Sequence, residues 1–296
     1  MRKFIVSDLH GNGNMYISIM KYLENVNKED EIILYINGDL IDRGLDSADM
    51  LLDVRKRIIN KKGFKINYLG GNHELMMYQA SLKRKENNQW PIFSNWFLNG
   101  GKITQYRLEE LIDLKEELQI IKFISNLDIY KLFKEKIDDK QIVLVHAKCP
   151  NNPKNKCDLK IKDNNYQVDK YVWTREEDLR PILKESLGNK NYFTIIGHTS
   201  VSEKEGYKYY NEYNCINIDG GCAAYASGYL DFDHTPLVEI DEKNNRLIIL
   251  TFNNNNEIIY GNYFSEKKSI EMNKKELNSK RKYIDKNIKI KKLDYV

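Results

Sequence analysis

Short apolar runs alternate with longer amphipathic stretches over the first 70 residues of the chain. Apolar runs bounded by turn residues predict strands, and a period near 3.6 predicts helices between them. We expect strands over residues 3–7, 31–37 and 66–69, with helices over residues 15–26 and 47–59. Strands that alternate with helices in this way favour parallel pairing and an α/β fold.

The pattern changes at residue 73 and is mainly helical as far as about residue 127. Trp90-Pro91 and Asn99-Gly100-Gly101 interrupt it, because proline and glycine break or end helices. We therefore expect a helical insertion or cap over residues 73–127. Strand patterns resume at 142–145, 193–196 and 215–218, and residues 237–240 and 247–252 predict a hairpin across 241–245. The asparagine run 253–256 predicts a turn or loop.

Polar side chains that can bind metals follow these predicted strands within a few residues. The set consists of Asp8 and His10 after the first strand, Asp39 after the second, Asn72 after the third, and His146 and His198 after later ones. Ligands of an open α/β sheet gather outside the carboxyl ends of its strands. The order of the motifs therefore predicts one spatial cluster.

Composition indicates a globular protein large enough to bury a sizeable core. The chain has 296 residues, of which 41% are hydrophobic and 30% charged, and no apolar run approaches the roughly 18 residues that a membrane-spanning helix requires. Charged residues near the start argue against a signal peptide, so we expect a cytoplasmic protein without membrane contact. Four cysteines (Cys149, Cys157, Cys215 and Cys222) show no CxxC pair, and we expect free thiols.

The net charge of +4 is concentrated in a basic C-terminal extension. Residues 263–296 hold 11 Lys and Arg against 5 Asp and Glu, which leaves 36 against 38 in residues 1–262. Such a tail could contact nucleic acid or an acidic partner. We favour a solvated helix with exposed lysines, because the tail lacks the regular aromatic residues of a stacking platform.

Five short motifs carry the candidate chemistry. They are Asp8-Leu9-His10-Gly11, Gly38-Asp39-Leu40-Ile41-Asp42-Arg43-Gly44, Gly71-Asn72-His73-Glu74, Val145-His146 and Gly197-His198-Thr199. Each one alone is weak evidence, since a strand-end aspartate is more often a turn former than a ligand. Together they supply the carboxylate oxygen, amide oxygen and imidazole nitrogen that divalent cations prefer, without a thiolate, and they contain four of the five histidines.

A pair of divalent ions needs a shared ligand, and a carboxylate can bridge two ions. We assign the bridge to Asp39, with Asp8 and His10 completing the first ion. The second ion would be completed by Asn72, His146 and His198. Water held between such ions has a lowered pKa and can attack phosphorus in line at neutral pH.

Four further residues are candidates for acid catalysis and phosphate binding. His73 follows the ligand Asn72 and, in an extended backbone, would point elsewhere and could protonate the leaving oxygen. Asp42 would orient that imidazole. Arg43 and Arg175 carry planar guanidinium groups that match phosphate oxygens. We favour phosphate binding for both, with a surface salt bridge as the alternative for Arg175. His234 is interpreted as a loop residue.

At these motifs the chain resembles the calcineurin-like metallophosphoesterases, and among them the phosphoprotein phosphatase family. The likeness runs from residue 3 to about 228, and Val172-Trp173-Thr174-Arg175 resembles the stretch that supplies a second phosphate-binding arginine in bacterial and phage members. The resemblance implies a central two-sheet β-sandwich flanked by helices, within a catalytic domain over residues 1–262. It also implies a metal pair, often manganese, or iron with zinc, and a metal-bound hydroxide as nucleophile.

The chain departs from the family pattern at three places. Ser7 stands where glycine is usual, Asn37 precedes Gly38, and Lys148-Cys149-Pro150 replaces the glycine that usually follows His146-Ala147. None of these changes removes an expected ligand. The loop near the second metal is the part of the site that they affect most.

The resemblance leaves the substrate open, because cap and loop shapes determine it. We expect a serine/threonine protein phosphatase that acts on a phosphoprotein or a phosphorylated small molecule. A symmetrical dinucleoside tetraphosphate hydrolase is the alternative, since such enzymes resemble this chain at Trp96, Asn99-Gly100-Gly101 and Thr104. An alternative from another class is a nucleic-acid end-processing or binding protein that uses the basic tail.

Overall fold

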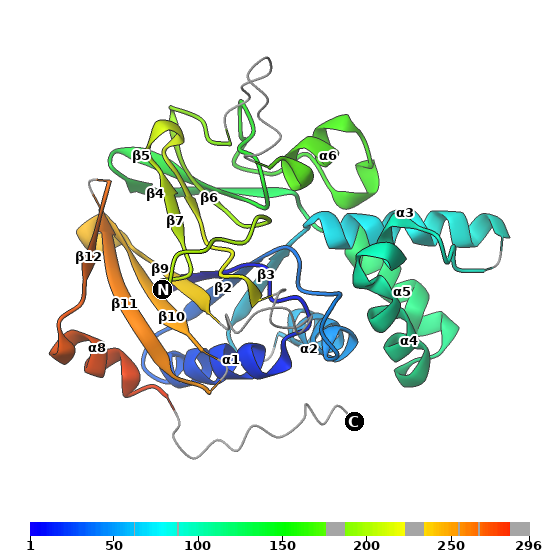
Figure 1. Ribbon diagram of the computed structural model, residues 1–296, viewed down its shortest axis with the longest axis horizontal. Helices are drawn as coiled ribbons and strands as arrows, with labels where there is room; N and C mark the ends of the chain where they lie inside the picture. The colour runs from blue at the N-terminus through cyan, green and yellow to red at the C-terminus, as the bar shows by residue number, and fades with distance from the viewer. Residues whose placement is uncertain are drawn as a thin grey trace.

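Two β-sheets pack face to face, with helices on the outside (Figure 1). The computed structural model describes residues 1–61, 63–87, 89–175, 187–222, 234–253, 255–265 and 267–284. The seven-stranded sheet has the order β12 (Lys268–Glu271), β11 (Ile258–Ser265), β10 (Arg246–Phe252), β9 (Thr235–Asp241), β1 (Arg2–Val6), β2 (Ile32–Asn37) and β3 (Lys65–Leu69). The five-stranded sheet has the order β4 (Tyr130–Ile137), β5 (Lys140–Val145), β6 (Tyr192–Ile196), β8 (Cys215–Asn217) and β7 (Lys208–Tyr210). The predicted mixed α/β sandwich is confirmed.

The predicted parallel strands and the hairpin are present. Strands β1, β2 and β3 pair in parallel, with Leu34 of β2 opposite both Phe4 and Ile66. β9 and β10 form the predicted antiparallel hairpin. The sequence pattern did not reveal β4, β7, β11 and β12. Three of them, β4, β7 and β12, lie at sheet edges, where charged or partly exposed residues interrupt the apolar pattern.

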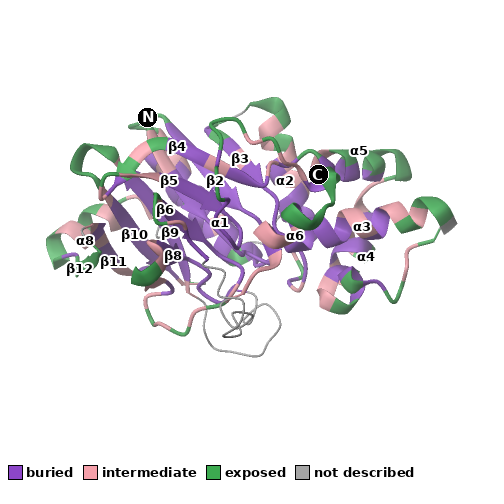
Figure 2. Cartoon of the chain, turned by 90° about the horizontal axis from the view of Figure 1, so that it is seen from above, coloured by how far each residue is buried: buried purple, intermediate pink, exposed green. Residues whose placement is uncertain are grey.

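Alternating side chains of the central strands build two hydrophobic layers. Ile33 and Tyr35 of β2 belong to the cluster between the two sheets, whereas Leu34 and Ile36 belong to the cluster beneath the helices. All residues of β2 are buried, as expected of a parallel strand covered on both faces. The burial colours of Figure 2 follow the same layering, with buried strands at the centre and exposure on the outer helices.

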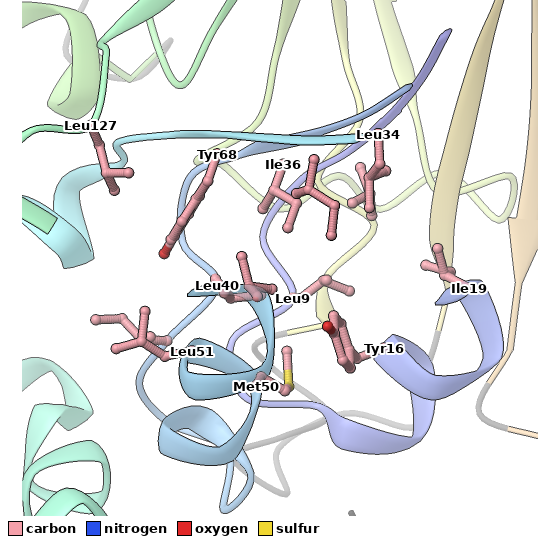
Figure 3. Close-up of a cluster of buried hydrophobic side chains, with 14 of the residues drawn as sticks. Leu9, Tyr16, Ile19, Leu34, Ile36, Leu40, Met50, Leu51, Tyr68 and Leu127 are labelled. Atoms are coloured by element: carbon pink, nitrogen blue, oxygen red, sulfur yellow. The ribbon is translucent and has the colours of Figure 1, made fainter. Parts of the chain in front are cut away.

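Helices α1 (Gly13–Asn27) and α2 (Ser47–Asn60) cover the outer face of the seven-stranded sheet (Figure 1). Figure 3 shows the apolar side chains that they contribute, among them Tyr16 and Ile19 of α1 and Met50 and Leu51 of α2. α1 begins immediately after the first motif, because the side chain of Asn12 accepts the backbone N–H of Met15. Packing of these two helices thus fixes the loops that follow β1 and β2.

A helical layer follows β3, as the sequence predicts. It consists of α3 (Asn72–Asn87), the irregular turn η1 (Phe97–Gly101), α4 (Lys102–Leu111) and α5 (Leu114–Ser125). The expected break lies at Asn99 and Gly100, whose backbone angles are not helical. α4 packs on α2, where Arg107 Nε lies 3.0 Å from a carboxylate oxygen of Asp49. The remaining short elements are η2 (Ile161–Asp163), α6 (Tyr166–Trp173), η4 (Asn211–Tyr213) and η5 (Glu242–Asn244).

Part of the expected basic extension packs on the body of the protein. After β12, α8 (Lys274–Arg281) turns back, and Arg281 donates to the backbone oxygen of Ile258. The ring of Tyr283 meets that of Tyr22, and the Asn25 amide donates to the Tyr283 backbone oxygen at 2.9 Å. Residues 285–296 of the extension lie outside the described residues.

Two expectations from composition can be compared with the structure. Cys149, Cys157, Cys215 and Cys222 are all free, and only Cys157 is partly exposed. Among the described residues, none of the helices combines the length and the apolar character needed to cross a membrane.

Candidate metal centre

The carboxyl ends of strands from both sheets meet at one edge of the sandwich, and the predicted ligands lie there. Asp8 and His10 follow β1, Asp39 follows β2, Asn72 follows β3, His146 follows β5, and His198 follows β6. All of these side chains are buried. The structure therefore brings the predicted ligand residues together from positions almost 200 residues apart in the chain.

Several of these residues have a left-handed backbone, which residues other than glycine adopt rarely. Positive φ angles occur at Asp8, His10, Asp39, Asp42, Arg43 and His198. Such strained positions cluster at functional sites, where the surrounding structure holds them in place. The strain here coincides with the motifs and supports a functional reading of this edge.

Asp39 lies between two groups of imidazoles and turns one oxygen toward each. Its Oδ2 lies 3.4 Å from Nε2 of His10, and its Oδ1 lies 3.3 Å from Nε2 of His146. His10, Asp39 and His73 form one group of ligand atoms within 4.8 Å of one another, and Asp39, His146 and His198 form the other. A carboxylate shared by two such groups has the placement of a bridging ligand.

Two histidine rings are oriented by backbone carbonyl groups. Nδ1 of His10 lies 3.1 Å from the oxygen of Ile41, and Nδ1 of His146 lies 2.9 Å from the oxygen of Asn37. Since a carbonyl only accepts, each Nδ1 carries a proton, and Nε2 is the nitrogen that each ring can offer to a metal. In metal-binding histidines a hydrogen bond to the second ring nitrogen fixes the same arrangement. Oδ1 of Asn72 lies 3.0 Å from Nε2 of His146, so the amide oxygen adjoins the same candidate ligand.

His198 offers its other nitrogen. Its Nε2 lies 3.2 Å from the backbone oxygen of Trp173, whereas its Nδ1 is buried without a hydrogen-bond partner. A buried imidazole nitrogen without a partner is costly unless something binds it, and a cation would do so. The residues at this edge therefore fit a pair of divalent ions.

Asp8 lies at the same edge but is engaged with the protein. Its carboxylate accepts the backbone N–H of His198 at 3.0 and 3.1 Å and the hydroxyl of Ser7. No group of ligand atoms in the described chain includes it. Its assignment to the first metal stays a prediction.

Electrostatics at this edge also favour cations. Burial raises the pKa of Asp8, Glu74 and Asp219, and neighbouring carboxylates raise it further. Burial opposes ionisation of Asp39, but the charges of His146 and His73 hold its pKa well below the usual range. So many acidic groups in a dry space are stabilised in the charged form by a bound cation.

His73 does not lie in an extended backbone, as the sequence interpretation required, but in the first turn of α3. Its Nδ1 nevertheless lies 2.7 Å from Oδ2 of Asp42, as predicted, and its Nε2 lies 3.8 Å from Oδ2 of Asp39. Nε2 of His73 lies 3.1 Å from Nη2 of Arg43. Arginine only donates, so Nε2 accepts and Nδ1 carries the proton to Asp42.

The cap holds Asp42 from the other side. The Trp96 indole donates to Asp42 Oδ2 at 2.8 Å, and the Thr104 hydroxyl donates to Oδ1 at 2.6 Å. All three side chains are fully buried. Sequence reasoning named Trp96 and Thr104 only as points of resemblance and gave them no role.

Glu74 holds the loops beneath the site. Its two oxygens accept the backbone N–H groups of Asp39, Leu40 and Gly71 at 2.8–3.1 Å and the hydroxyl of Tyr68 at 2.6 Å. Glu74 is the last residue of the motif Gly71-Asn72-His73-Glu74, and its place in that motif is the sequence signal that could have identified it. A carboxylate with this many donors fixes the β2 and β3 loops relative to each other.

Arg175 reaches the site from the end of α6. Its Nη1 donates to the backbone oxygen of His198 at 3.1 Å and to the hydroxyl of Thr199 at 3.2 Å. Its guanidinium thus lies beside a predicted metal ligand, and its contacts within the described part of the chain are not those of a surface ion pair. Phosphate binding by Arg43 and Arg175 stays a prediction.

Asp219 is a buried acidic residue that the sequence interpretation missed. It follows β8, and its oxygens accept the N–H of Gly221 at 3.0 Å and the hydroxyl of Ser200 at 3.2 Å. Its charge raises the pKa of Asp8. The rule that selected Asp8 and Asp39 would have found it, because it stands directly after a predicted strand. The end of the resemblance near residue 228 lies outside the described residues.

Comparisons with known proteins bear on this site. A family model described as calcineurin-like phosphoesterase matches residues 1–283. No curated protein matches the sequence. A protein serine/threonine phosphatase from Saccharomyces cerevisiae, with similarity to human phosphatase PP5, is 13% identical, with 86% of this chain and 80% of that chain covered and a TM-score of 0.48.

Two other solved structures are similar at the same level. A structure provisionally described as a diadenosine tetraphosphatase is 14% identical, covers 85% of this chain and 93% of its own, and has a TM-score of 0.47. A cold-active protein-tyrosine phosphatase of a psychrophilic Shewanella species is 15% identical, covers 89% and 80%, and has a TM-score of 0.45. At these values the three structures carry no argument about activity.

Proposed function

The chain belongs to the calcineurin-like phosphoesterase family, and from that premise we propose that it is a serine/threonine protein phosphatase. Metal-dependent phosphoester hydrolysis is supported by the family and by the two groups of ligand atoms around Asp39. The identity of the substrate and of the metals is the part that we add.

The metals would be held by the residues named above. We assign Asp8, His10 and Asp39 to one ion and Asp39, Asn72, His146 and His198 to the other, with manganese as our first choice and iron or zinc as alternatives. When bound, such ions polarise the phosphate and lower the pKa of a coordinated water. The protein contributes the buried, pre-oriented nitrogen and oxygen atoms that hold them.

The observation that carries the proposal is the Asp42–His73 pair at 2.7 Å. A carboxylate on Nδ1 stabilises the imidazolium form of His73, whose Nε2 proton can pass to the leaving oxygen once Arg43 turns to the phosphate. An alkoxide leaving from phosphoserine or phosphothreonine is about as basic as hydroxide, whose parent water has a pKa of about 15.7. A phosphate leaving group has a second pKa of only about 6 and departs without protonation. A buried Asp–His pair is therefore needed most by an enzyme that releases an alcohol.

Two arginines flank the space in which the ester would bind. Arg43 contacts Nε2 of His73, so a phosphate beside that nitrogen is within reach of the same guanidinium. Arg175 lies beside the other group of candidate ligands, against the backbone oxygen of His198. We assign both to binding and charge neutralisation of the phosphate.

The test is manganese-dependent phosphate release from the full chain. Phosphoserine and phosphothreonine peptides are compared with diadenosine tetraphosphate and an aryl phosphate at matched concentrations, with chelator-treated protein as the blank. Preference for the peptides supports the proposal. Preference for the dinucleotide, with two diphosphates as products, would replace it by the dinucleoside hydrolase, and absence of turnover with any metal would reject both.

The proposal also includes a cytoplasmic location, a bacterial type of phosphatase, and a phosphoprotein or phosphorylated small molecule as partner. Nucleic-acid contact through the basic extension is the competing interpretation of that segment. A chain that ends at residue 284 keeps β12 and α8. Comparing it with the full chain tests the nucleic-acid interpretation without disturbing the sheet. Salt-dependent oligonucleotide affinity that this truncation abolishes would favour the nucleic-acid interpretation.

A further inference from the structure

Both oxygens of the Asp42 carboxylate accept hydrogen bonds from buried side chains. Oδ2 accepts from Nδ1 of His73 at 2.7 Å and from the Trp96 indole at 2.8 Å, and Oδ1 accepts from the Thr104 hydroxyl at 2.6 Å. The Thr104 oxygen in turn accepts the backbone N–H of Asp42 at 3.2 Å. Thr104 therefore forms hydrogen bonds with both the backbone and the side chain of Asp42.

The glycine break of the cap makes this approach possible. A Cβ atom on Gly101 would lie 2.3 Å from the indole nitrogen of Trp96, so only glycine leaves the indole its place. Gly100 has φ +99°, and its backbone oxygen accepts the N–H of Arg43 at 3.4 Å. Trp96 and the η1 turn that follows it thus contact both Asp42, the partner of the His73 imidazole, and Arg43, the candidate phosphate ligand.

We propose that Trp96 and Thr104 are positioning residues of the cap, which fix the Asp42 carboxylate and through it the imidazole of His73. A carboxylate held on both oxygens is kept from rotating, so the hydrogen bond from His73 Nδ1 to Asp42 Oδ2 keeps one orientation. A proton donor is effective only when its geometry is held within narrow limits. The inference rests on the proposed function in that it takes His73 as the donor to the leaving alcohol.

Positioning of a proton donor predicts a particular kinetic signature. Loss of one hydrogen bond to a charged group should lower kcat for alkyl phosphates and phosphoserine peptides by about tenfold to a hundredfold. Aryl phosphates with an acidic leaving group need no donor and should change by less than about threefold. KM should stay the same for both, because neither side chain meets the phosphate.

The variants are Trp96→Phe and Thr104→Val, each of which removes one donor in a side chain of similar shape. Trp90→Phe is the matched control, because the Trp90 indole stacks in the same aromatic cluster but its nitrogen has no hydrogen-bond partner. Thr104→Ser keeps the hydroxyl and should restore the activity that Thr104→Val loses. If Trp96→Phe fails to fold, the threonine pair still decides the question.

Two further measurements separate positioning from general disruption. In an Asp42→Asn background, Trp96→Phe should cost little, because its effect would pass through Asp42; undiminished loss there would overturn the inference. In the metal-free protein, the Nδ1 proton of His73 should give a downfield proton resonance that moves in Thr104→Val and Trp96→Phe but not in Trp90→Phe. An unmoved resonance together with full peptide turnover in both variants would reject the positioning role.

The resonance requires no substrate, so the two proposals fail separately. A resonance that moves as expected in a protein that hydrolyses only the dinucleotide would support the positioning role and reject the protein phosphatase. Preference for phosphopeptides with equal losses on alkyl and aryl substrates in Thr104→Val would do the reverse.

Discussion

Glu74 accepts the backbone N–H of Asp39 at 2.9 Å, and so the loop that carries the candidate bridging carboxylate rests on a second carboxylate. Glu74→Gln would replace one accepting oxygen by an NH2 group, which cannot accept the backbone N–H groups of the surrounding loops. We expect a loss of about 1–3 kcal/mol in the free energy of unfolding of the metal-free protein. Urea unfolding measures it, with Glu86→Gln at an exposed position of the same helix as control. Equal stability of the two variants would contradict the role of Glu74.

Above about pH 7, the stability of the metal-free protein should fall as pH rises. Burial lowers the pKa of His146, but the carboxylates of Asp39 and Asp8 outweigh it and raise the pKa to about 10. This contribution is fully present below the ordinary value of 6.5 and is lost as pH rises through about 10. Burial and the Asp219 charge raise the pKa of Asp8, which acts in the same direction.

Bound metal should weaken this pH dependence, because cations bind the deprotonated ligands. The measurement is Tm at about pH 7 and about pH 9, with manganese and with a chelator. Below about pH 7 the opposite trend of His10 and His198, whose pKa burial lowers, would also contribute. We expect the chelated protein to lose more stability between the two values than the manganese-loaded protein does. A chelated protein that becomes more stable toward high pH would show that the carboxylates do not hold His146 protonated.

Asp39→Asn should remove metal from both groups of ligands, since both include this side chain. We expect turnover to be abolished and elemental analysis to show less than two ions per chain. His198→Gln should lose one ion only, whereas His234→Gln, at a ring that packs on Tyr260, should keep both. Two ions and normal activity in Asp39→Asn would exclude it as the bridge.

The substitution His73→Asn should leave a folded, metal-loaded protein. Its kcat should fall by about a hundredfold or more on phosphoserine peptides, whose leaving group is a strong base. The fall should be smaller on activated aryl phosphates, and the two series of substrates can be compared in one steady-state assay. Equal losses on both would assign His73 to structure or to metal binding instead of proton transfer.

The parts of this site that sequence predicts and the parts that it misses differ for a physical reason. The ends of parallel strands lie at one edge by topology, so Asp8, Asp39 and Asn72 can be placed near one another from order alone. His146 follows β5 of the other sheet, and its approach depends on how the two sheets pack. The partners of Asp42 come from a helical layer, where no periodicity tells that Trp96 faces the site. Likewise, β4 and β12 escape the pattern because their exposed, charged positions dilute the apolar signal.

Gly100 offers a test of whether the cap also positions Arg43. Alanine at Gly100 must adopt φ +99°, and its Cβ would lie 2.9 Å from Cγ and 3.0 Å from the backbone nitrogen of Arg43. Gly63 is the matched control, since it has φ +74° but nothing within 4 Å of a Cβ. Both substitutions should cost about 1 kcal/mol in stability through backbone strain. Only Gly100→Ala should raise KM for phosphoesters, because only its new methyl group would displace Arg43. Similar KM values in the two variants would mean that Arg43 is held independently of the cap.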